Sequence, residues 1–528
     1  MRPLIEETLN QMLEQTSRRF PGHCALSFGD QSWTYGQLQQ LTDEIAAGLL
    51  ASGVCKGDHV GILSENTPNA IFAFLGVIKA GCVACMLNTS LKAEELAELA
   101  ALSDIRHLMI GSHYKDHIFY QISRDMARHC SLTHVFDIGQ QPSSPYCSLG
   151  QLEQAGRQNM EAYQRQQALL TPEDDCLILY TSGTTGTHAK AVVSTHFHLV
   201  NGGIQKACAM NICQQDVICC ALQLFHIFCI DVNILAAIAA GAELAIPDDL
   251  HSGSILKTLV HRACTVLSSV PFTFRTILKN PAFSADPPVT LRTGIIGGAY
   301  CSPENFCKIQ EAFGFTLLPG LGQTEATAGI TVGYFSDSLE TRSTTVGHFV
   351  DHSEGKIISL ENGEPVPAGR TGEICIRSRL LMKGYYNRPD LTAQIIDPDG
   401  WLHTGDLGFL DADGSLHYMG RKKELINRGG EKIVPSQVES ALLQIPQIEC
   451  CKVMGIPDPM LGEEVCACIV LRDGSILSAD DIRQMLKDKL AAFKLPREIL
   501  FFQALPLNAA GKIQLNQLLE MVVERIAL

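Results

Sequence analysis

The segment Tyr180-Thr-Ser-Gly-Thr-Thr-Gly-Thr-His-Ala-Lys190 begins with seven residues that include five hydroxyl side chains and two glycines. It follows the apolar run Cys176–Leu179, which has the composition of a buried strand. Glycines let backbone N–H groups approach an anion, hydroxyls add hydrogen-bond donors, and a lysine adds positive charge. The segment therefore predicts a phosphate-binding loop at a strand end, although similar loops also occur as plain turns. It is not a Walker loop, because no Gly-Lys-Ser/Thr follows at that spacing.

The length and composition of the chain indicate a globular enzyme of two or more domains. Its 528 residues are too many for one core, and 46% of them are hydrophobic against 18% charged. A net charge of −15 argues against general nucleic-acid binding. Twenty cysteines without a visible secretion signal predict reduced thiols in a cytoplasmic protein. The most apolar stretch, Val217–Pro247, contains several polar residues, so we expect buried core and no transmembrane segment.

Helix and strand patterns alternate through the first part of the chain. The expected strands are His59–Leu63, Val83–Leu87 and His107–Gly111, and the expected helices are Asp43–Ser52, Ala70–Ala80 and Ala93–Leu102. This alternation predicts a layered α/β subdomain over residues 1–175. The polar, Gln-rich segment Ser143–Asp175 is expected to be a surface connection, and a second α/β subdomain is expected over residues 176–330.

The pattern of expected secondary structure changes near residue 345, from alternating helices and strands to short strands. Short strands separated by Gly, Pro and Asp turns are expected at Lys356–Leu360, Gly372–Arg377, Leu407–Leu410 and Ser415–Tyr418. They predict a small β-rich subdomain, which we place at residues 331–420. A mixed pattern then returns, with a helix at Pro435–Leu443, strands at Cys451–Gly455 and Val465–Leu471, and a helix at Ala479–Leu490. A boundary at Arg421–Lys423 would separate a large N-terminal domain from a small α+β domain, 421–528.

Other glycine-containing segments have the features of ligand sites. Gly297-Gly298-Ala299 and Gly320-Leu321-Gly322-Gln323-Thr324-Glu325 each follow an apolar run, where a ligand can approach the backbone closely. Glu325 could hold a Mg²⁺ that bridges phosphate oxygens, and Asp406 suits the hydroxyls of a ribose. An ordinary loop is the alternative reading in each case. Asp411–Gly414 is most simply a hairpin turn.

Three further features are ambiguous when taken alone. Positive charge concentrates from Gly420 to Lys432, either as a solvated turn or as a segment that meets phosphates. His226 in the sequence Phe225-His-Ile-Phe-Cys229 reads as a core histidine when considered by itself. Lys512, on a glycine loop near the C-terminus, would ordinarily be exposed and without function.

Taken together and in order, the segments resemble the adenylate-forming superfamily of acyl-CoA synthetases, luciferases and peptide-synthetase adenylation domains. The resemblance covers nearly the whole chain and includes at least eight ordered segments. These are Thr181–Gly186, Phe225-His226, Gly297–Ala299, Thr324-Glu325, Gly384-Tyr-Tyr-Asn387, Thr404–Asp406, Gly420-Arg421 and Gly511-Lys512. The resemblance implies a large N-terminal domain of two α/β subdomains and a β-barrel, followed by a small mobile C-terminal domain.

The resemblance also implies two half-reactions. A carboxylic acid first attacks the α-phosphate of MgATP, which gives acyl-AMP and pyrophosphate, and a thiol then attacks the acyl-AMP. Catalysis would rest mainly on positioning and on stabilisation of charge. The implied cofactors are ATP, Mg²⁺ and CoA.

The family's functional residues map onto this sequence by motif. Thr181, Ser182, Gly183, Thr184, Thr185 and Gly186 would hold phosphates, with Thr185 and Glu325 at the metal and Thr324 at the α-phosphate. Gly298, Ala299, Gly320, Leu321, Gly322, Gln323 and Lys190 would line the nucleotide site, and Asp406 with Arg421 would bind the ribose. Lys512 would act in adenylation, Lys423 would be the hinge, His226 would be a gate beside the acyl pocket, and Arg428, Gly429, Gly430 and Lys432 would line the pantetheine tunnel.

Several positions depart from the family pattern. The segment His188-Ala-Lys-Ala191 replaces the usual Pro-Lys-Gly, and the loop before Lys190 is one residue longer, which puts the role of Lys190 in doubt. Leu321 stands where an aromatic residue usually packs on adenine. Tyr300 stands after Gly-Gly-Ala, where the family commonly has proline. Leu515 stands after the lysine loop, where the family frequently has a basic residue. Because no residue needed for the chemistry is missing, we expect an active enzyme.

The acceptor and the acid are less constrained than the chemistry. His226 stands where amino-acid-activating members carry an aspartate, so an amino acid substrate is disfavoured. CoA is the favoured acceptor, and an acyl-AMP ligase that loads a carrier protein is the alternative. Phe228, Cys229 and Ile230 suggest a fatty or aryl acid, whereas Asp231 leaves a carnitine-like acid open. A luciferase-like enzyme and an inactive nucleotide- or acyl-CoA-binding relative also remain, and the sequence is compatible with a homo-oligomer.

Overall fold

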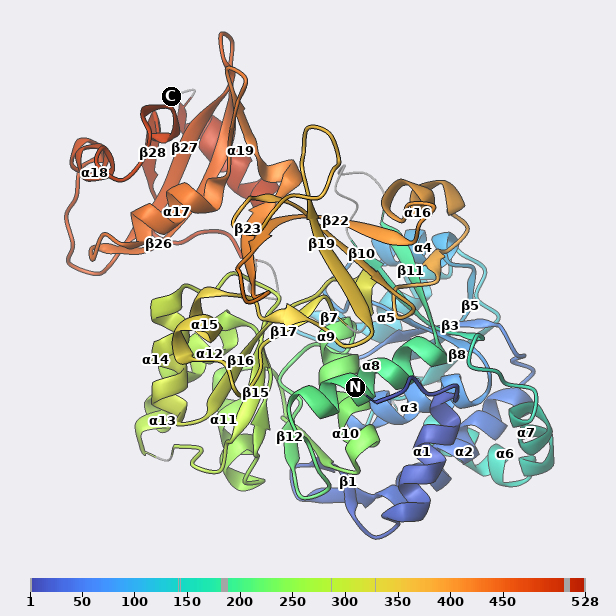
Figure 1. Cartoon of the computed structure of the whole chain (residues 1–528). Coiled ribbons are helices and arrows are strands. Elements are labelled where there is room, and N and C mark those ends of the chain that lie inside the picture. The colour runs from blue at the N-terminus through green and yellow to red at the C-terminus, as the bar shows by residue number, and fades with distance from the viewer. Residues whose placement is uncertain are drawn as a thin grey trace. The chain divides into compact units, whose positions relative to one another are not determined.

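The computed structural model describes residues 2–140, 142, 144–181, 189–285, 287–327, 329–507 and 513–526. Packing divides the chain into two compact units (Figure 1). The first comprises Met1–Ser343, Gly347–Glu354 and Arg377–Leu402, and the second comprises Thr344–Val346, Gly355–Ile376 and His403–Leu528. Each unit is described by itself. None of the helices in the described ranges has the length and apolar character needed to cross a bilayer.

An eight-stranded sheet of the first unit carries the segment that precedes the predicted phosphate loop. In spatial order its strands are β21 (Gly384–Tyr385), β11 (Lys190–Thr195), β10 (Asp175–Thr181), β4 (Val83–Met86), β3 (His59–Leu63), β5 (Ile105–Ile110), β8 (His134–Asp137) and β9 (Cys147–Ser148). The strands from β10 to β9 in this order run parallel, whereas β11 is antiparallel to both β10 and β21. Buried parallel strands explain the continuous apolar runs at β3 and β10.

A nine-stranded sheet forms the second layer of the same unit. Its order is β18 (His348–Phe349), β17 (Thr331–Val332), β16 (Thr316–Leu321), β15 (Thr293–Ile296), β14 (Val266–Leu267), β12 (Val217–Cys219), β13 (Glu243–Ile246), β1 (Cys24–Phe28) and β2 (Gln31–Thr34). Sheet membership therefore does not follow the predicted division at residue 175. The N-terminal strands β1 and β2 join this sheet, while β10 and β11 complete the eight-stranded one. The division into subdomains stays a prediction.

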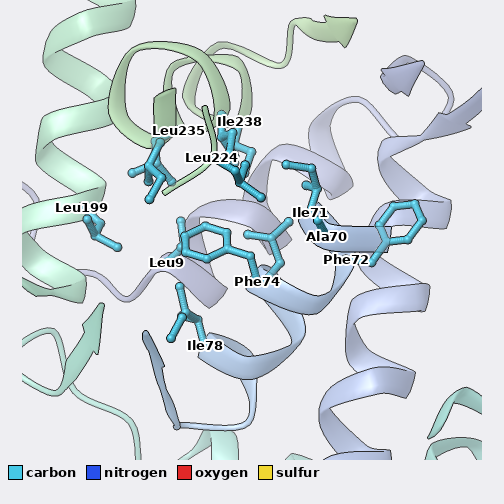
Figure 2. Packing of buried hydrophobic residues seen from close by; sticks show 14 of the residues in the cluster. Leu9, Ala70, Ile71, Phe72, Phe74, Ile78, Leu199, Leu224, Leu235 and Ile238 are labelled. Atoms are coloured by element: carbon cyan, nitrogen blue, oxygen red, sulfur yellow. The ribbon is translucent and has the colours of Figure 1, made fainter. Parts of the chain in front are cut away.

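The main core of the first unit lies where N-terminal helices meet helices from beyond residue 195. It includes side chains of α1 (Leu9–Arg19), α2 (Tyr35–Ala51), α3 (Pro68–Lys79), α8 (His196–Ala209) and α10 (Ala236–Ala240). In Figure 2, Leu9, Phe74 and Ile78 lie near Leu199, Leu235 and Ile238. A separate cluster joins α11 (Ser252–His261), α12 (Pro271–Leu278), α13 (Pro281–Ala285) and α14 (Pro303–Phe313) to β14, β15 and β16. Residues 217–247 are mostly buried, as predicted.

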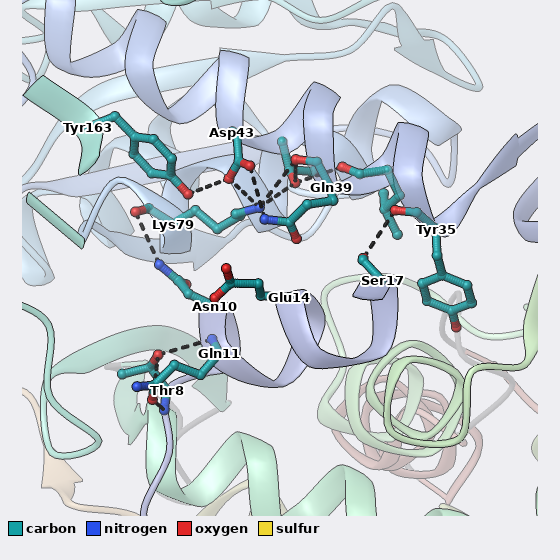
Figure 3. Close-up of polar contacts among 12 residues, drawn as sticks. Thr8, Asn10, Gln11, Glu14, Ser17, Tyr35, Gln39, Asp43, Lys79 and Tyr163 are labelled. Carbon is teal, nitrogen blue, oxygen red and sulfur yellow. Dashed lines mark hydrogen bonds and ion pairs between the residues drawn. The ribbon is translucent and has the colours of Figure 1, made fainter. Parts of the chain in front are cut away.

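A buried charge fixes three helices around this core. The ammonium of Lys79 lies 2.6 Å from Oδ1 of Asp43, and Tyr163 donates its hydroxyl to the same carboxylate (Figure 3). Burial lowers the pKa of Lys79, and the carboxylate of Asp43 opposes that shift. Thr42 accepts a 3.0 Å hydrogen bond from Lys79. Because a buried ammonium is costly unless it is paired, this network specifies how α2, α3 and α7 (Met160–Gln167) pack.

The segment predicted as a polar surface connection is largely helical, which the sequence analysis did not predict, and its role as a connection stays a prediction. It contains α6 (Leu149–Arg157) as well as α7, and α6 packs closely on α2. A methyl group at Gly156 would lie 1.8 Å from the carbonyl oxygen of Glu44, and one at Gly48 would lie 2.1 Å from that of Leu152. Glycine at both positions therefore permits the helices to approach. Their polar outer faces explain the polar, Gln-rich composition of the segment.

The region predicted as a barrel contributes to three sheets. Strands β17 and β18 join the nine-stranded sheet, and β21 joins the eight-stranded one. The remaining strands form a sheet in the order β19 (Ser353–Ile358), β20 (Gly372–Ser378), β22 (Trp401–Leu410) and β23 (Leu416–Arg421). Residues 411–414 connect β22 to the antiparallel β23, as the predicted hairpin turn requires.

The C-terminal part of the second unit has cores of its own. Its sheet follows the order β25 (Glu431–Ile433), β24 (Ile426–Arg428), β27 (Gly462–Leu471) and β26 (Ile448–Asp458), and β28 (Glu498–Phe501) pairs with β27. Helices α17 (Pro435–Leu443) and α18 (Ala479–Leu486) contribute to one apolar cluster, and α19 (Leu515–Ile526) contributes to another. Helices and sheets alternate in both units, so the predicted α/β class is confirmed.

Candidate nucleotide-binding site

The predicted phosphate loop connects two antiparallel strands. Thr181 ends β10 and is paired in register with Lys190, the first residue of β11. The residues between them that were predicted to bind phosphate, Ser182, Gly183, Thr184, Thr185 and Gly186, lie outside the described residues, as does His188. The hydroxyl of Tyr180 is 2.5 Å from Oγ of Ser103, so this hydroxyl already has a hydrogen-bond partner.

The Gly297-Gly298-Ala299 segment is at the carboxyl end of β15, as predicted. A methyl group on Gly297 would lie 2.7 Å from the carbonyl oxygen of Gly320, so glycine is needed for the close approach of β15 to β16. Gly298 has φ +76° and, like Ala299, is exposed. Ligands of open α/β sheets bind at the carboxyl ends of strands, so both residues stand where a nucleotide can contact backbone.

The segment Gly320–Glu325 follows the same rule at the neighbouring strand. Gly320 and Leu321 end β16, Gly322 is exposed, and Thr324 begins the short 3₁₀ helix η2 (Thr324–Ala326). The side-chain nitrogen Nε2 of Gln323 is shielded from solvent and has no hydrogen-bond partner among the described residues. A buried donor without a partner calls for one, and a bound nucleotide offers acceptors.

A tyrosine outside the predicted site residues contacts the carboxylate of Glu325. Tyr385, in β21, donates its hydroxyl to Oε1 of Glu325 at 2.7 Å. Burial raises the pKa of Tyr385, and the negative charge of Glu325 raises it further, so the hydroxyl stays protonated. The ammonium of Lys190 lies 4.8 Å from the centre of the same ring, a cation–π contact. Tyr385 thus connects two of the predicted residues.

The segment around Phe225 contains one buried ring and, directly after it, one exposed ring. Phe225 is buried, whereas His226 is exposed and lies 4.7 Å from the Phe225 ring, measured between ring centres. The reading of His226 as a core histidine is therefore wrong. His226 precedes α9 (Ile227–Cys229), which continues into a π-helix, η1 (Ile230–Leu235). π-Helices are rare and are often found at functional sites.

Polar groups are buried on the π-helix. Both carboxylate oxygens of Asp231 and both amide atoms of Asn233 are shielded from solvent, without a hydrogen-bond partner among the described residues. Burial raises the pKa of Asp231 to about 7, and the nearby charge of Lys206 on α8 opposes the shift. Lys206 is itself buried, which lowers its pKa. The carboxylate of Asp231 and the ammonium of Lys206 therefore each favour the charged form of the other.

Asp406 and Arg421 lie opposite each other in the second unit. They are paired in register on β22 and β23, and Nε of Arg421 is 3.2 Å from Oδ1 of Asp406. Asp406 is 2% exposed. Burial disfavours the charge on Arg421, but Asp406, Tyr418 and Glu424 together outweigh this effect and raise the pKa of the guanidinium. The pair predicted to bind a ribose is therefore preformed within this unit.

The predicted hinge and tunnel residues lie further along the second unit. Lys423 is in the 3₁₀ helix η3 (Lys422–Glu424), and burial together with the charge of Arg421 lowers its pKa. Gly429 and Gly430 have φ +59° and +93° and form the turn between β24 and β25, which carries the exposed Lys432. Arg428 forms an ion pair with Glu464, so its charge is already balanced. The predicted catalytic Lys512 lies outside the described residues.

The described residues fit a magnesium ion that is held mainly by a nucleotide. They contain no group of three or more His, Cys, Asp or Glu side chains placed to hold a metal. Mg²⁺ usually binds one or two carboxylates together with substrate phosphates, and it does not need an all-protein cage. Glu325 offers such a carboxylate, one oxygen of which is oriented by Tyr385.

Comparison with known proteins gives a consistent assignment along the chain. The family described as AMP-binding enzyme matches residues 13–386, and the AMP-binding enzyme C-terminal domain matches residues 437–512. YngI of Bacillus subtilis, provisionally named an acyl-CoA synthetase, is 34% identical over 99% of this chain and 98% of its own. The mitochondrial medium-chain acyl-CoA ligase ACSF2 of Rattus norvegicus is 29% identical over 99% of this chain and 89% of its own.

Solved structures agree with the fold. The anthranilate CoA ligase AuaEII in complex with anthranoyl-AMP superposes with a TM-score of 0.86 at 25% identity, covering 100% of this chain and 99% of its own. ATP-bound MatB from Rhodopseudomonas palustris gives a TM-score of 0.85 at 24% identity, covering 97% and 98%. These similarities support a large N-terminal and a small C-terminal domain. Since the family match covers most of the chain and includes the strand-end motifs described above, the chain belongs to the AMP-binding enzyme family.

Proposed function

We propose that this AMP-binding enzyme is an acyl-CoA synthetase. It activates a carboxylic acid with ATP to acyl-AMP and pyrophosphate, and then transfers the acyl group to CoA with release of AMP. The observation that carries this proposal is the agreement, over 99% of the chain, with relatives named as acyl-CoA synthetases or ligases. An enzyme with this activity is an AMP-forming acid–thiol ligase.

The first half-reaction needs the acid and the α-phosphate held in line. We assign the phosphates to the loop from Thr181 to Gly186, and the α-phosphate to Thr324. Lys512 would place positive charge beside the carboxylate and the α-phosphate oxygens, where negative charge develops as the new P–O bond forms. Pyrophosphate leaves with the electrons of the broken P–O bond. These residues mainly offset the free-energy cost of holding two anions, the carboxylate and the α-phosphate, close together in the reactive orientation.

Magnesium, when bound, supplies charge neutralisation on the phosphate oxygens, and Glu325 would hold it together with Thr185. The backbone at Gly298, Ala299 and Gly320–Gly322 would surround the nucleotide. Leu321 provides an aliphatic surface where the family usually stacks an aromatic ring, so we expect a modest nucleotide affinity. Asp406 would accept hydrogen bonds from the ribose hydroxyls, with Arg421 beside it.

The second half-reaction needs a thiol to reach the acyl carbon. The sulfur of CoA attacks that carbon, the C–O bond to AMP breaks, and AMP leaves with the electron pair. We assign the pantetheine arm to the turn at Gly429 and Gly430 and to Lys432, with Lys423 as the hinge and His226 as the gate. The free state of all twenty cysteines fits a reducing, cytoplasmic location.

The best candidate for the substrate is a carboxylic acid whose chain or ring is apolar and carries no charge. Ile227 and Phe228, which are only partly buried, follow His226 and pack against the apolar core. Asp231 is buried and already under the electrostatic influence of Lys206, so a quaternary ammonium would compete with this lysine for the carboxylate. The carnitine-like acid that Asp231 suggested is therefore disfavoured, and medium-chain fatty acids and aryl acids come first.

The test is pyrophosphate release from MgATP with a panel of acids, each with and without CoA. The panel runs from acetate through octanoate and palmitate to benzoate, cinnamate and carnitine. We expect release with one apolar class, accelerated by CoA, and formation of the acyl-CoA by mass spectrometry. Release that ignores CoA would indicate a carrier-protein acceptor. No release with any acid, despite measured ATP binding, would overturn the proposal and favour an inactive relative.

A further inference from the structure

We infer that Tyr385 is a positioning residue for adenylation, which orients the carboxylate of Glu325 for the metal–nucleotide and also holds Lys190 beside the phosphate loop. This deepens the proposed function and rests on it for the role of Glu325. The inference starts from the two contacts of one side chain: its hydroxyl on Oε1 of Glu325 at 2.7 Å, and its ring 4.8 Å from the ammonium of Lys190.

The contact with Glu325 is reinforced by the backbone of the same segment. Met382 donates its N–H to the carbonyl oxygen of Glu325 at 2.9 Å. The segment from Met382 to Tyr385 therefore fixes both the main chain and the side chain of Glu325. Glu325 belongs to a helix of only three residues, which has few hydrogen bonds of its own to hold it in place. External contacts must supply the rigidity that a metal-binding carboxylate needs.

Tyr385 is in turn firmly held. Tyr385 is 6% exposed and packs with Val192, Met382 and Leu391. Strand β21 pairs with β11, which places Tyr385 opposite Val192, and the N–H of Tyr385 donates to Oγ1 of Thr392 at 2.9 Å. A buried ring with anchored main chain presents its hydroxyl in one direction, so it can transmit the rigidity of the sheet to Glu325.

The second contact of Tyr385 is with Lys190, at the start of the strand that follows the predicted phosphate loop. Lys190 is paired in register with Thr181, the last described residue before the loop. The departure at His188-Ala189-Lys190 put the role of this lysine in doubt. The ring of Tyr385 gives it a defined position, because an ammonium is attracted to the face of an aromatic ring. Tyr385 thereby couples the loop strand β11 to the carboxylate of Glu325.

The chemical consequence follows from how Glu325 is used. Oε1 of Glu325 accepts a hydrogen bond from the hydroxyl of Tyr385. The second carboxylate oxygen would then be available to bind a divalent cation. Without that hydroxyl the carboxylate can rotate, and ordering it would cost free energy each time a metal–nucleotide binds. Loss of partners that orient metal ligands typically lowers metal affinity or activity by about 10–100-fold. We therefore expect the defect to appear in the metal dependence.

The test compares Tyr385→Phe with Tyr386→Phe. Phenylalanine at 385 keeps the ring and the contact with Lys190 but removes the hydroxyl. Tyr386 is the adjacent residue, and its hydroxyl donates to the carboxylate of Asp104 on the exposed surface, so it is a matched control for the loss of one hydroxyl. The readouts are binding of Mn²⁺ to the enzyme with a non-hydrolysable ATP analogue, by electron paramagnetic resonance, and the Mg²⁺ concentration for half-maximal pyrophosphate release.

We expect Tyr385→Phe to weaken Mn²⁺ binding and to raise the Mg²⁺ requirement by about 10-fold or more, while Tyr386→Phe leaves both unchanged. Equal melting temperatures of the two variants would exclude a general folding defect. Equal Mn²⁺ binding by Tyr385→Phe and wild type would overturn the inference, as would a wild type that binds no Mn²⁺ with the analogue. The Mn²⁺ measurement uses no acid and no CoA, so failure of the synthetase proposal is seen separately, in the acid panel.

Discussion

At the scale of single residues, the Asp406–Arg421 pair gives a direct test of nucleotide binding. Asp406→Asn removes the charge of a buried carboxylate but keeps its size, and hydrogen bonds to charged groups contribute about 1.5–3 kcal/mol. We expect the Kd for an ATP analogue to rise by about 10-fold or more, measured by isothermal titration calorimetry. Asp411→Asn is the control, because Asp411 is a hairpin-turn residue that contacts His417. Equal affinities of the two variants would remove Asp406 from the site.

Sequence alone anticipates some of these residues better than others. Glu325 and Asp406 lie on loops with distinctive neighbours, so a local motif is enough to predict them. Tyr385 belongs to a matched motif, yet its role was not predicted, because its partners Glu325 and Lys190 are distant in sequence and become neighbours only through the pairing of β21 with β11. His226 was misread by itself because its apolar neighbours suggest burial, whereas the turn before α9 exposes the ring.

At the scale of elements, the packing of α6 on α2 can be tested by two glycines of one helix. Gly156→Ala would place a methyl group 1.8 Å from the carbonyl of Glu44, so the helices must separate. Gly150→Ala is the control, since nothing lies within 4 Å of the added methyl group. We expect Gly156→Ala to lower the melting temperature, with a cost of about 1–3 kcal/mol typical of overpacking. Gly150→Ala should be neutral or slightly stabilising. Equal melting temperatures would contradict the packing described.

Element boundaries followed the strength of local signals. Strand β3 and helices α4 (Ala93–Leu102) and α17 were predicted with their observed limits, because apolar periodicity and proline mark them. Helix α2 begins eight residues earlier than predicted, at Tyr35, where Thr34 forms a capping box with Gln37. Helices α6 and α7 were missed because mostly polar surface helices depend on tertiary packing, which the sequence pattern does not display.

At the scale of the whole molecule, the buried Asp231 predicts a pH dependence of stability. Its pKa is about 7 in the folded protein against an ordinary 3.8, so the folded chain keeps a proton that the unfolded chain loses. Stability should therefore fall as pH rises from about 4 to 7, and the penalty should persist above pH 7. Asp231→Asn should raise the melting temperature at pH 8 and change it little at pH 4.

The control for this prediction is Asp216→Asn. Burial disfavours the charged form of Asp216, but hydrogen bonds from Arg292 and Thr265 outweigh it and lower the pKa. Its ionised form therefore stabilises the fold above about pH 4, and the Asn variant should lose stability at pH 8. A melting temperature of Asp231→Asn that falls at pH 8, as in the control, would show that the charge of Asp231 contributes to stability.

The predicted boundary at Arg421–Lys423 can be tested by expressing residues 421–528 alone. Two apolar clusters, centred on β26, β27 and α17–α19, lie entirely within this range. We expect the fragment to fold, with dispersed amide resonances in an NMR spectrum and cooperative melting by circular dichroism. The longer fragment 344–528 adds Gly355–Ile376 and residues 403–420 of the same unit, together with residues 347–354 and 377–402 of the first unit. A fragment 421–528 that stays unfolded while 344–528 folds would move the boundary toward the N-terminus.

The pairing of β21 with β11 also bears on how a ribosome delivers this protein. Residues up to Thr195 supply seven strands of the eight-stranded sheet, but the strand that covers β11 contains Gly384 and Tyr385. At a synthesis rate of roughly 5–20 residues per second, the edge of β11 waits for about ten seconds or more before its partner emerges. Unpaired strand edges attract other chains. The nascent enzyme therefore passes through a stage in which the strand beside its phosphate loop is open to misassembly, and slower translation between these strands would lengthen that exposure.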